Sequence, residues 1–260
     1  MSGAAPGLAA SGADTAPGSA DVLTLPLLLA GPLQAWGSAS RFARRSTENA
    51  PTKSGVIGLL AAALGRDRTA DLTDLVALRF GVRVDQPGTR VRDYQTAHHM
   101  VTGASMPVSE RFYLSDAVFV AAVEGDPELI GRLHDAVRAP AFLPYLGRRS
   151  CPPSRPVDLG GPVAEPLETV LRDQPWQASG WYQRRRGWRE GSKIALTTLL
   201  DAEPGDQRAD SLRDLPLSFD PRHRRYGLRA VSSDSVDVPN PQTRRTTAPD
   251  HDPFSAFGDR

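Results

Sequence analysis

Three side chains near the middle of the chain could cleave RNA without a metal ion. Tyr94, His98 and His99 are suitable types, because a histidine can take the proton of a ribose 2′-hydroxyl while a second group protonates the leaving oxygen. Adjacent residues of a strand point to opposite sides, so two neighbouring histidines there could not act together on one proton. We therefore favour contact or packing roles for these side chains and keep catalysis as the alternative.

The motif Lys53-Ser54-Gly55 invites comparison with the phosphate-binding loop of nucleoside triphosphatases. That loop requires a glycine directly before the lysine and another five residues earlier, where this chain has Thr52 and Thr47. A triphosphatase is therefore excluded. A helix that begins at Lys53 would still offer unpaired amide groups to an anion such as an RNA phosphate, although the same motif suits a helix that merely begins at the surface.

Arg148 and Arg149 follow Tyr145-Leu146-Gly147 and have the form of a phosphate clamp. Paired guanidinium groups make charge-assisted hydrogen bonds to phosphate, and an adjacent glycine lets the backbone approach a ligand closely. The alternative interpretation of the same residues is a solvated turn.

The net charge of +1 hides an uneven distribution, because basic and acidic residues gather in different parts of the chain. Such a distribution suits a protein that contacts phosphate on one surface and protein on another. Any single basic group could instead be ordinary solvated surface. The basic residues form four islands: Arg41, Arg44, Arg45 and Lys53; Arg148, Arg149 and Arg155; Arg184, Arg185, Arg186, Arg189 and Lys193; Arg222, Arg224, Arg225 and Arg229.

The single cysteine, Cys151, excludes an internal disulfide and a four-thiolate zinc site. His134, His223 and His251 have no metal-ligand spacing with it, so we expect neither a metal nor a cofactor. No apolar run approaches the ~20 residues needed to span a membrane, and residues 1–20 lack the basic start and apolar core of a signal peptide. We expect a reduced, cytoplasmic protein without membrane contact, whose residues 1–20 form a disordered tail.

The apolar pattern predicts an α+β fold of the ferredoxin-like (RRM-like) type. That plan is an antiparallel sheet with two helices on one face, and the RNA-recognition motif shares it. We expect helices where apolar residues recur at helical spacing between capping residues, and strands where apolar runs are continuous. The predicted order is strand 25–30, helix 52–64 capped by Thr52 or Ser54 and ended by Gly65, strand 75–84, strand 116–123, helix 127–137 capped by Asp126, and a last strand at 142–146.

Residues 88–112 form an insertion that is too long for a simple turn and is therefore expected to be a projecting hairpin. Its Met100, Val101, Met106 and Val108 are apolar without belonging to the core pattern, which is typical of a binding surface. The remaining organisation predicted is a main unit over 21–150, a linker over 151–166, a small β-rich part over 167–236 and a disordered tail over 237–260.

Five motifs, in order along the chain, resemble those of the CasD family, a subunit of the CRISPR type I-E Cascade complex. Residues 31–37 (Gly-Pro-Leu-Gln-Ala-Trp-Gly) resemble its opening loop, and residues 51–60 resemble its first helix. Residues 92–96 and 111–117 resemble the two sides of its thumb base. Residues 144–152 (Pro-Tyr-Leu-Gly-Arg-Arg-Ser-Cys-Pro) resemble its most distinctive block.

The resemblance implies a ferredoxin-like palm with a β-hairpin thumb at about 88–112. It implies that the protein caps the 5′ handle of the guide RNA (crRNA), and contacts the backbone subunit CasC and the large subunit CasA. Target DNA would be reached indirectly, through the complex. Thumb residues Met100, Val101, Met106 and Val108 would bind the partner. The expected RNA-binding residues are Gln34, Trp36, Arg41, Arg44, Arg45, Lys53, Ser54, Arg92, Tyr94, Arg111, Tyr145, Arg148 and Arg149.

A different function remains as the alternative, because in type I-C systems the corresponding family member is itself the nuclease. This chain would then be a metal-independent endoribonuclease that processes precursor crRNA with Tyr94, His98 and His99. The sequence supplies the means to grip RNA more clearly than a pair of catalytic groups. We therefore predict an RNA-binding subunit that is not an enzyme.

Overall fold

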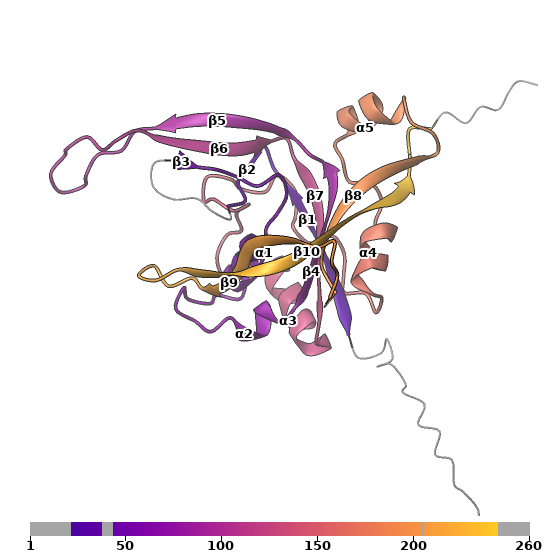
Figure 1. Ribbon diagram of the computed structural model, residues 1–260, viewed down its shortest axis with the longest axis horizontal. Helices are drawn as coiled ribbons and strands as arrows, with labels where there is room; N and C mark the ends of the chain where they lie inside the picture. Colours follow the sequence, from indigo (N-terminus) through magenta and orange to yellow (C-terminus); the bar gives the residue numbers. More distant parts are fainter. Residues whose placement is uncertain (1–21, 38–43, 204, 244–260) are drawn as a thin grey trace, which may run out of the picture.

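The computed structural model describes residues 22–37, 44–203 and 205–243, and they form the α+β fold that the sequence predicts (Figure 1). The main element is a six-stranded antiparallel sheet. None of the helices in these ranges is long and apolar enough to cross a membrane. In spatial order the strands are β1 (Leu23–Ala30), β7 (Val118–Gly125), β4 (Arg79–Gln86), β8 (Lys193–Asp201), β10 (Arg225–Pro239) and β9 (Asp210–Ser218).

Helices cover both faces of this sheet, because its central strands are apolar on both sides. Helices α1 (Lys53–Ala63) and α3 (Pro127–Arg138) pack on one face, where Phe119 of β7 joins the main core cluster. Helix α4 (Leu167–Asp173) packs on the other face against Val120 of the same strand. Successive side chains of a strand point to opposite faces, so the continuous apolar run of β7 serves both layers.

The two helices expected on one face begin at the caps that the sequence indicates. The side chain of Thr52 accepts a hydrogen bond from the Gly55 amide at 3.2 Å, and that of Asp126 accepts one from the Leu129 amide at 3.0 Å. Each cap satisfies an amide that the first helical turn leaves unpaired. Gly65 follows α1 with φ of +75°, a conformation that glycine adopts without strain.

The strand predicted over 75–84 begins later than expected. Residues Thr73–Val76 form the short helix α2, and β4 starts only at Arg79. The side chain of Asp71 accepts hydrogen bonds from the amide and the hydroxyl of Thr73, at 3.2 and 2.7 Å. This local turn chemistry favours a helical start over a strand.

The last strand expected by the ferredoxin-like plan, at 142–146, is wrong. Residues 142–146 contain no strand, because Pro144 cannot donate to a ladder and Gly147 turns the chain with φ of +83°. The edge beside β1 is instead lined by the predicted linker, which makes two isolated antiparallel bridges to it, Thr24 with Val163 and Leu27 with Asp158.

The strands after residue 190 extend the main sheet instead of forming a sheet of their own. β8 pairs with β4, with Gly81 opposite Leu200. β10 continues to Pro239, past the predicted start of a tail at 237, and the buried Asn240 side chain donates to the Gly187 and Gly191 carbonyls. Residues 1–20 and 244–260 of the predicted tails lie outside the described residues.

A buried ion pair anchors the segment that follows the predicted linker. Arg83 of β4 and Asp85 are both fully buried, and Arg83 Nε donates to Asp85 Oδ1 at 2.7 Å. The same guanidinium group donates to the carbonyls of Leu171, Gln174 and Pro175, where α4 ends. The last carbonyls of a helix need such donors, so this arginine fixes α4 to the sheet.

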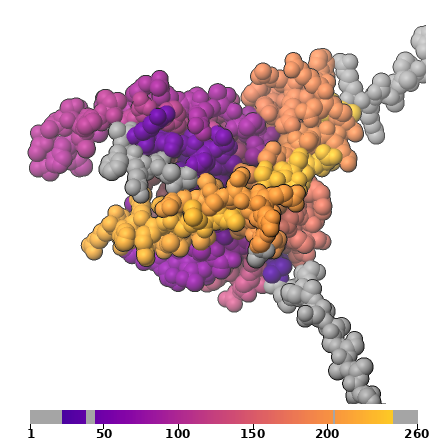
Figure 2. All heavy atoms as spheres, in the orientation of Figure 1, coloured from indigo at the N-terminus to yellow at the C-terminus, as the bar shows by residue number. Residues whose placement is uncertain are grey.

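A second, smaller sheet carries the insertion. β5 (Thr89–Gln95) and β6 (Ser109–Ser115) form an antiparallel hairpin, which β2 (Leu33–Gln34) and β3 (Arg44–Arg45) join on the other side of β6. The hairpin extends well beyond the main sheet at the left of Figures 1 and 2. Its distant end carries Met100 and Val101 with their side chains almost wholly exposed, and Met106 and Val108 about half exposed.

Candidate nucleic-acid interface

One face of the smaller sheet carries two arginines, two aromatic rings and the carboxylate of Glu110, which lies 4.0 Å from Arg44 Nε. Arg92 of β5 lies opposite Phe112 of β6, and Tyr94 lies opposite Glu110. Arg44 of β3 is also paired with Glu110, in parallel register. Residues that are directly opposite on paired strands share a face of the sheet, so these five side chains lie together. We call Arg44, Arg92, Tyr94 and Phe112 the Arg–aromatic face.

The guanidinium groups of this face lie over its rings. Arg92 Cζ is 5.0 Å from the centre of the Tyr94 ring, and Arg44 Cζ is 5.3 Å from that of Phe112. Tyr94 is 54% exposed although it is aromatic. Exposed rings stack on unpaired bases, and arginine binds phosphate or stacks on a base in turn. The geometry therefore suits single-stranded nucleic acid.

The opposite face of the same sheet is held by Arg148, which was predicted to clamp phosphate. Its Cζ lies 4.7 Å from the centre of the Tyr113 ring. Its Nη1 donates to the Phe112 carbonyl at 3.0 Å and its Nη2 to the Arg45 carbonyl at 2.9 Å. In this structure the Arg148 guanidinium group therefore braces β6 against β3, and its phosphate contact stays a prediction; Arg149 is exposed.

The loop that carries Arg148 and Arg149 packs closely against Ala35 and Trp36. A Cβ atom on Gly147 would lie 1.8 Å from the Ala35 carbonyl oxygen, so only glycine fits there. Burial raises the pKa of the Cys151 thiol, which lies behind this loop. Tyr145 is half-buried, and Arg111 is half-buried on β6 opposite Asp93.

Helix α1 does begin at an anion site, but the protein fills that site itself. Asp214 Oδ2 of β9 accepts a hydrogen bond from the Lys53 amide at 2.8 Å. Lys53 Nζ donates to Asp201 Oδ2 at 2.9 Å and to the Leu78 carbonyl at 2.7 Å. Lys53 and Ser54 are both buried, so the prediction that they contact RNA is wrong.

Gln34 and Trp36 were also expected at the RNA surface, and the structure places both in the core. The Gln34 side chain donates to the Leu29 and Ala117 carbonyls and accepts from Trp36 Nε1 at 3.0 Å. A Cβ atom on Gly55 would lie 2.7 Å from the Trp36 ring, so this glycine is what admits the indole against α1. Since all polar groups of both side chains are used internally, their surface role is wrong.

The alternative catalytic residues lie on the projecting hairpin, two of them in its distant turn. His98 Nδ1 is 3.3 Å from the Gly103 carbonyl oxygen, and His99 Nδ1 accepts from the Thr102 amide at 3.2 Å. Both histidines are therefore engaged in holding the turn, whereas Tyr94 belongs to the Arg–aromatic face.

The arginines of the four basic islands lie in different environments. Arg41 lies outside the described residues. Arg155 donates to the Gln177 carbonyl at 3.1 Å, and Arg186 to Glu190 at 2.7 Å. Arg229 is buried and binds both oxygens of Asp214. Charge runs alone could not distinguish the buried Arg229 from the exposed arginines.

Phe112 is the one member of the Arg–aromatic face that was not singled out from the sequence. Its position opposite Arg92 depends on the hairpin register, which runs from Thr89–Ser115 to Gln95–Ser109. The signal was present, since a hairpin closed near residue 102 pairs these positions. To use this signal, the register of the hairpin must be known, and the length of the insertion alone does not determine that register.

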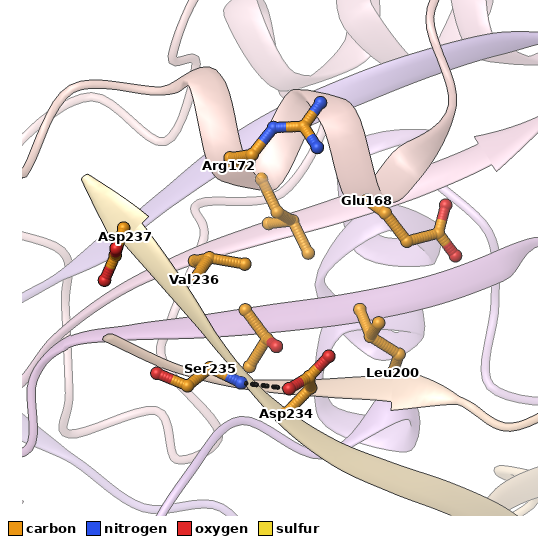
Figure 3. Close-up of a pocket in the computed structure, with 9 residues that line it drawn as sticks. Glu168, Arg172, Leu200, Asp234, Ser235, Val236 and Asp237 are labelled. Carbon is orange, nitrogen blue, oxygen red and sulfur yellow. Dashed lines mark hydrogen bonds between the residues drawn. The ribbon is translucent and has the colours of Figure 1, made fainter. Parts of the chain in front are cut away.

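A depression elsewhere on the molecule, of about 400 Å³, has the wrong charge for RNA. It lies between α4 and β10, and its lining includes Glu168, Asp234 and Asp237 but only one arginine, Arg172 (Figure 3). Carboxylates repel phosphate, so this depression does not compete with the Arg–aromatic face as a nucleic-acid site.

Comparison with known proteins adds independent information. The family model Cas_Cas5d, described as CRISPR-associated protein (Cas_Cas5), matches residues 24–232. The CRISPR system Cascade subunit CasD of Escherichia coli (strain K12) is 38% identical over 176 residues, which are 58% of this chain and 77% of that protein.

Two solved structures are similar as well. One is described as a crystal structure of a Cas protein, with a TM-score of 0.63, 39% identity and coverage of 85% of this chain and 97% of the other. The second belongs to a CRISPR RNA-guided surveillance complex, with a TM-score of 0.68, 32% identity and coverage of 83% and 91%. The family match runs from β1 into β10 and so spans both sheets.

Proposed function

Because this chain belongs to the CRISPR-associated Cas5 family, we propose that it is a guide-RNA-binding subunit of a Cascade surveillance complex. The relatives named as a Cascade subunit and as part of an RNA-guided complex support this role. The single observation that carries it is the Arg–aromatic face, whose guanidinium groups and rings match unstacked bases joined by phosphates.

In this proposal the protein caps the 5′ handle of the crRNA. Handle bases stack on Tyr94 and Phe112, while Arg44, Arg92 and the exposed Arg149 contact phosphates. The main sheet with α1 and α3 is a ferredoxin-like palm in which residues 157–163 stand in for the last strand. In this proposal the C-terminal strands β8, β9 and β10 are an extension of the palm sheet.

The projecting hairpin is proposed as the thumb. Its Met100 and Val101 lie at the far end of a two-stranded arm and are almost fully exposed among the described residues. Exposed apolar side chains on such a projection are typical of a binding surface. We assign this contact to the neighbouring backbone subunit CasC, and a further contact to the large subunit CasA. Target DNA is then met through the assembled complex.

The proposal is tested by measuring how much guide RNA the assembled complex retains. Tyr94→Ala together with Phe112→Ala removes both rings and leaves the paired backbones of β5 and β6 intact. The matched control is Phe142→Ala, an exposed ring on the loop after α3. We expect retained RNA to fall about tenfold or more for the double variant, since each stacked base contributes about 1–3 kcal/mol, and to stay unchanged for the control. Full retention in a folded double variant would refute the assignment.

We also propose that the protein holds RNA without cutting it. His98 and His99 bond within their own turn, and the described structure shows no base or acid positioned against either of them. Incubation of the purified chain with repeat-containing precursor RNA, without metal, should leave the RNA intact. Discrete products with 2′,3′-cyclic phosphate ends, lost in His98→Ala or His99→Ala, would support the endoribonuclease instead.

A further inference from the structure

The depression between α4 and β10 has a buried hydroxyl group in its lining. Thr198 of β8 is 2% exposed, and its Oγ1 makes no hydrogen bond to any of the described residues. Helix α5 (Gly180–Gly187), the next helix along the chain, contributes no residue to the lining. Buried hydroxyl groups are almost always hydrogen-bonded, because leaving one unpaired costs free energy. A ligand that donates to Thr198 from the depression would recover that free energy.

The pairing of β8 with β10 sets this hydroxyl group beside a carboxylate. Thr198 lies directly opposite Asp234 in the antiparallel register, so the two side chains share one face of the sheet. Asp234 is exposed, and its Oδ1 accepts a hydrogen bond from the Ser235 amide at 2.7 Å. Figure 3 shows Asp234 on β10 and Glu168 on α4 at two sides of the depression. Two acceptors on neighbouring strands therefore serve the same space.

The charge of the lining leaves one carboxylate without a cation. Asp234 takes part in no ion pair among the described residues. The other charged groups of the lining each have a partner of opposite charge: Glu168 with Arg79, Asp237 with Lys193 and Arg172 with Asp173. An uncompensated carboxylate beside an unpaired hydroxyl group attracts a cationic hydrogen-bond donor.

The remaining walls of the depression are apolar, which favours an organic cation. Leu171 of α4, Leu200 of β8 and Val236 of β10 line it, and its volume is about 400 Å³. The methylene stem of a long basic side chain packs on such walls while its charged end meets polar groups. No group of three or more histidine, cysteine or acidic side chains in the described ranges could hold a metal ion. The lining therefore suits a basic side chain better than a metal.

We propose that this depression receives the side chain of an arginine that belongs to a partner protein. The guanidinium group donates to Thr198 Oγ1 and to the Asp234 carboxylate, and the stem lies against Leu200 and Val236. Its five N–H donors have a fixed planar arrangement, so one group can serve both acceptors. Arginine is also enriched at protein interfaces, where lysine is depleted. A nucleic acid is the wrong occupant, because its phosphates are repelled by the carboxylate.

The proposal is tested first on the full-length protein with a small probe. Protein labelled at the methyl groups of threonine, leucine and valine is titrated with acetyl-Gly-Arg-Gly-amide and followed by NMR. The same peptide with citrulline has nearly the same shape but no charge. We expect the arginine peptide to shift the methyl signals of Thr198, Leu200 and Val236 in a saturable way. The citrulline peptide should bind about fivefold more weakly or less, because hydrogen bonds that involve a charged group are stronger.

Two variants separate the hydroxyl group from the charge. Thr198→Val keeps the shape of the side chain and should weaken binding of the arginine peptide about tenfold. Its melting temperature should not fall, since the Thr198 hydroxyl group makes no hydrogen bond within the described residues; a purely structural role would lower it. Asp234→Asn should weaken binding about threefold, as for a partly exposed ion pair. The matched control is Asp210→Asn, an exposed carboxylate of β9, which should bind the peptide as the parent does.

The partner is identified in the assembled complex by crosslinking. Ser235 is exposed and lines the depression, so it is replaced by the photoreactive residue benzoylphenylalanine, and the crosslinked peptides are identified by mass spectrometry. We expect a peptide of another protein subunit with an arginine within a few residues of the crosslink. The NMR titration does not depend on the proposed function, so its result holds whether or not the complex forms.

Three results would overturn the inference. In the first, the arginine and citrulline peptides bind equally, or neither shifts the methyl signals. In the second, Thr198→Val and Asp234→Asn bind the arginine peptide as tightly as the parent protein. In the third, position 235 crosslinks to no other protein, or only to residues 244–260 of this chain, whose Arg244 and Arg245 lie outside the described residues and would then be the occupants.

Discussion

Arg148 lies over the ring of Tyr113, 4.7 Å from its centre, and its guanidinium group also donates to the backbone carbonyls of Phe112 and Arg45. One side chain therefore joins the loop before Cys151 to two strands of the smaller sheet. The Arg–aromatic face is formed on the other side of those strands. Its geometry thus depends on an arginine that does not itself belong to it.

Substitution of Arg148 should consequently affect the stability of the protein more than substitution of Arg149. Arg148→Ala removes hydrogen bonds to two backbone carbonyls and should lower the free energy of unfolding by about 1–3 kcal/mol, measured by urea denaturation. Arg149→Ala removes an exposed side chain and should change stability by less than about 0.5 kcal/mol while weakening RNA binding. Equal stability of the two variants would show that Arg148 does not brace the sheet.

Removing one of the buried charges beside α1 should lower the free energy of unfolding by a larger amount. Arg229 binds Asp214 through Nε and Nη2 and binds Asp201 through Nη1, and Lys53 binds Asp201 in turn. Asp214→Ala should cost about 3–5 kcal/mol of stability, because it leaves the buried Arg229 with one carboxylate shared with Lys53. Asp234→Ala, which removes an exposed carboxylate of β10, is the control and should change stability little. A small loss for Asp214→Ala would mean that the C-terminal strands are not held by this network.

Cys151 offers a chemical check on the packing of the loop. Burial raises the pKa of its thiol, so the reactive thiolate is scarce at neutral pH and the sulfur is inaccessible. Alkylation of the native protein should be far slower than that of the urea-unfolded protein, and should accelerate as pH rises. Because a raised thiol pKa favours the neutral form in the folded state, its contribution to stability is fully present below the ordinary thiol pKa and is lost as the pH rises from there through the raised pKa of the folded state. Rapid stoichiometric labelling of the folded protein would contradict the buried position.

We expect that the hairpin tip can be removed without unfolding the rest of the protein. Replacing residues 96–108 by a short Gly-Ser turn leaves β5 and β6 in place, so the melting temperature should be nearly unchanged. Co-purification with the backbone subunit should nevertheless be lost, because Met100 and Val101 are removed. Met100→Ser with Val101→Ser is the milder version and should weaken assembly. A truncated protein that assembles normally would exclude the tip as a partner contact.

The sequence predicted the elements whose signals are local. Helix α1 begins at the Thr52 cap and α3 at the Asp126 cap, and the apolar run of β7 is a central strand. The strand expected at 142–146 failed because these residues form a loop in which Phe142 and Leu143 are exposed and only Leu146 is buried. An apolar run alone does not distinguish such a loop from a strand. The place of β8 beside β4 depends on a pairing between distant segments, which no local pattern encodes.

The candidate site was predicted less well, because residue type does not reveal where a side chain points. Lys53 looked like a phosphate ligand, but its partner Asp201 lies far along the chain and closes the site from within. Trp36 looked like a stacking ring, but Gly55 admits it to the core. Arg92 and Tyr94 were identified, and their relation to Phe112 emerged only from the register of the hairpin.

The most direct test of the central claim is photo-crosslinking of the guide RNA in the assembled complex, with crosslinked residues identified by mass spectrometry. Uridine analogues placed along the 5′ handle should crosslink to Tyr94 or Phe112, because these rings stack on handle bases in our account. The Tyr94→Ala and Phe112→Ala double variant should lose those crosslinks. A complex that contains this subunit and a full-length guide, yet whose handle crosslinks to other parts of the chain and never to the β5–β6 hairpin, would contradict the claim.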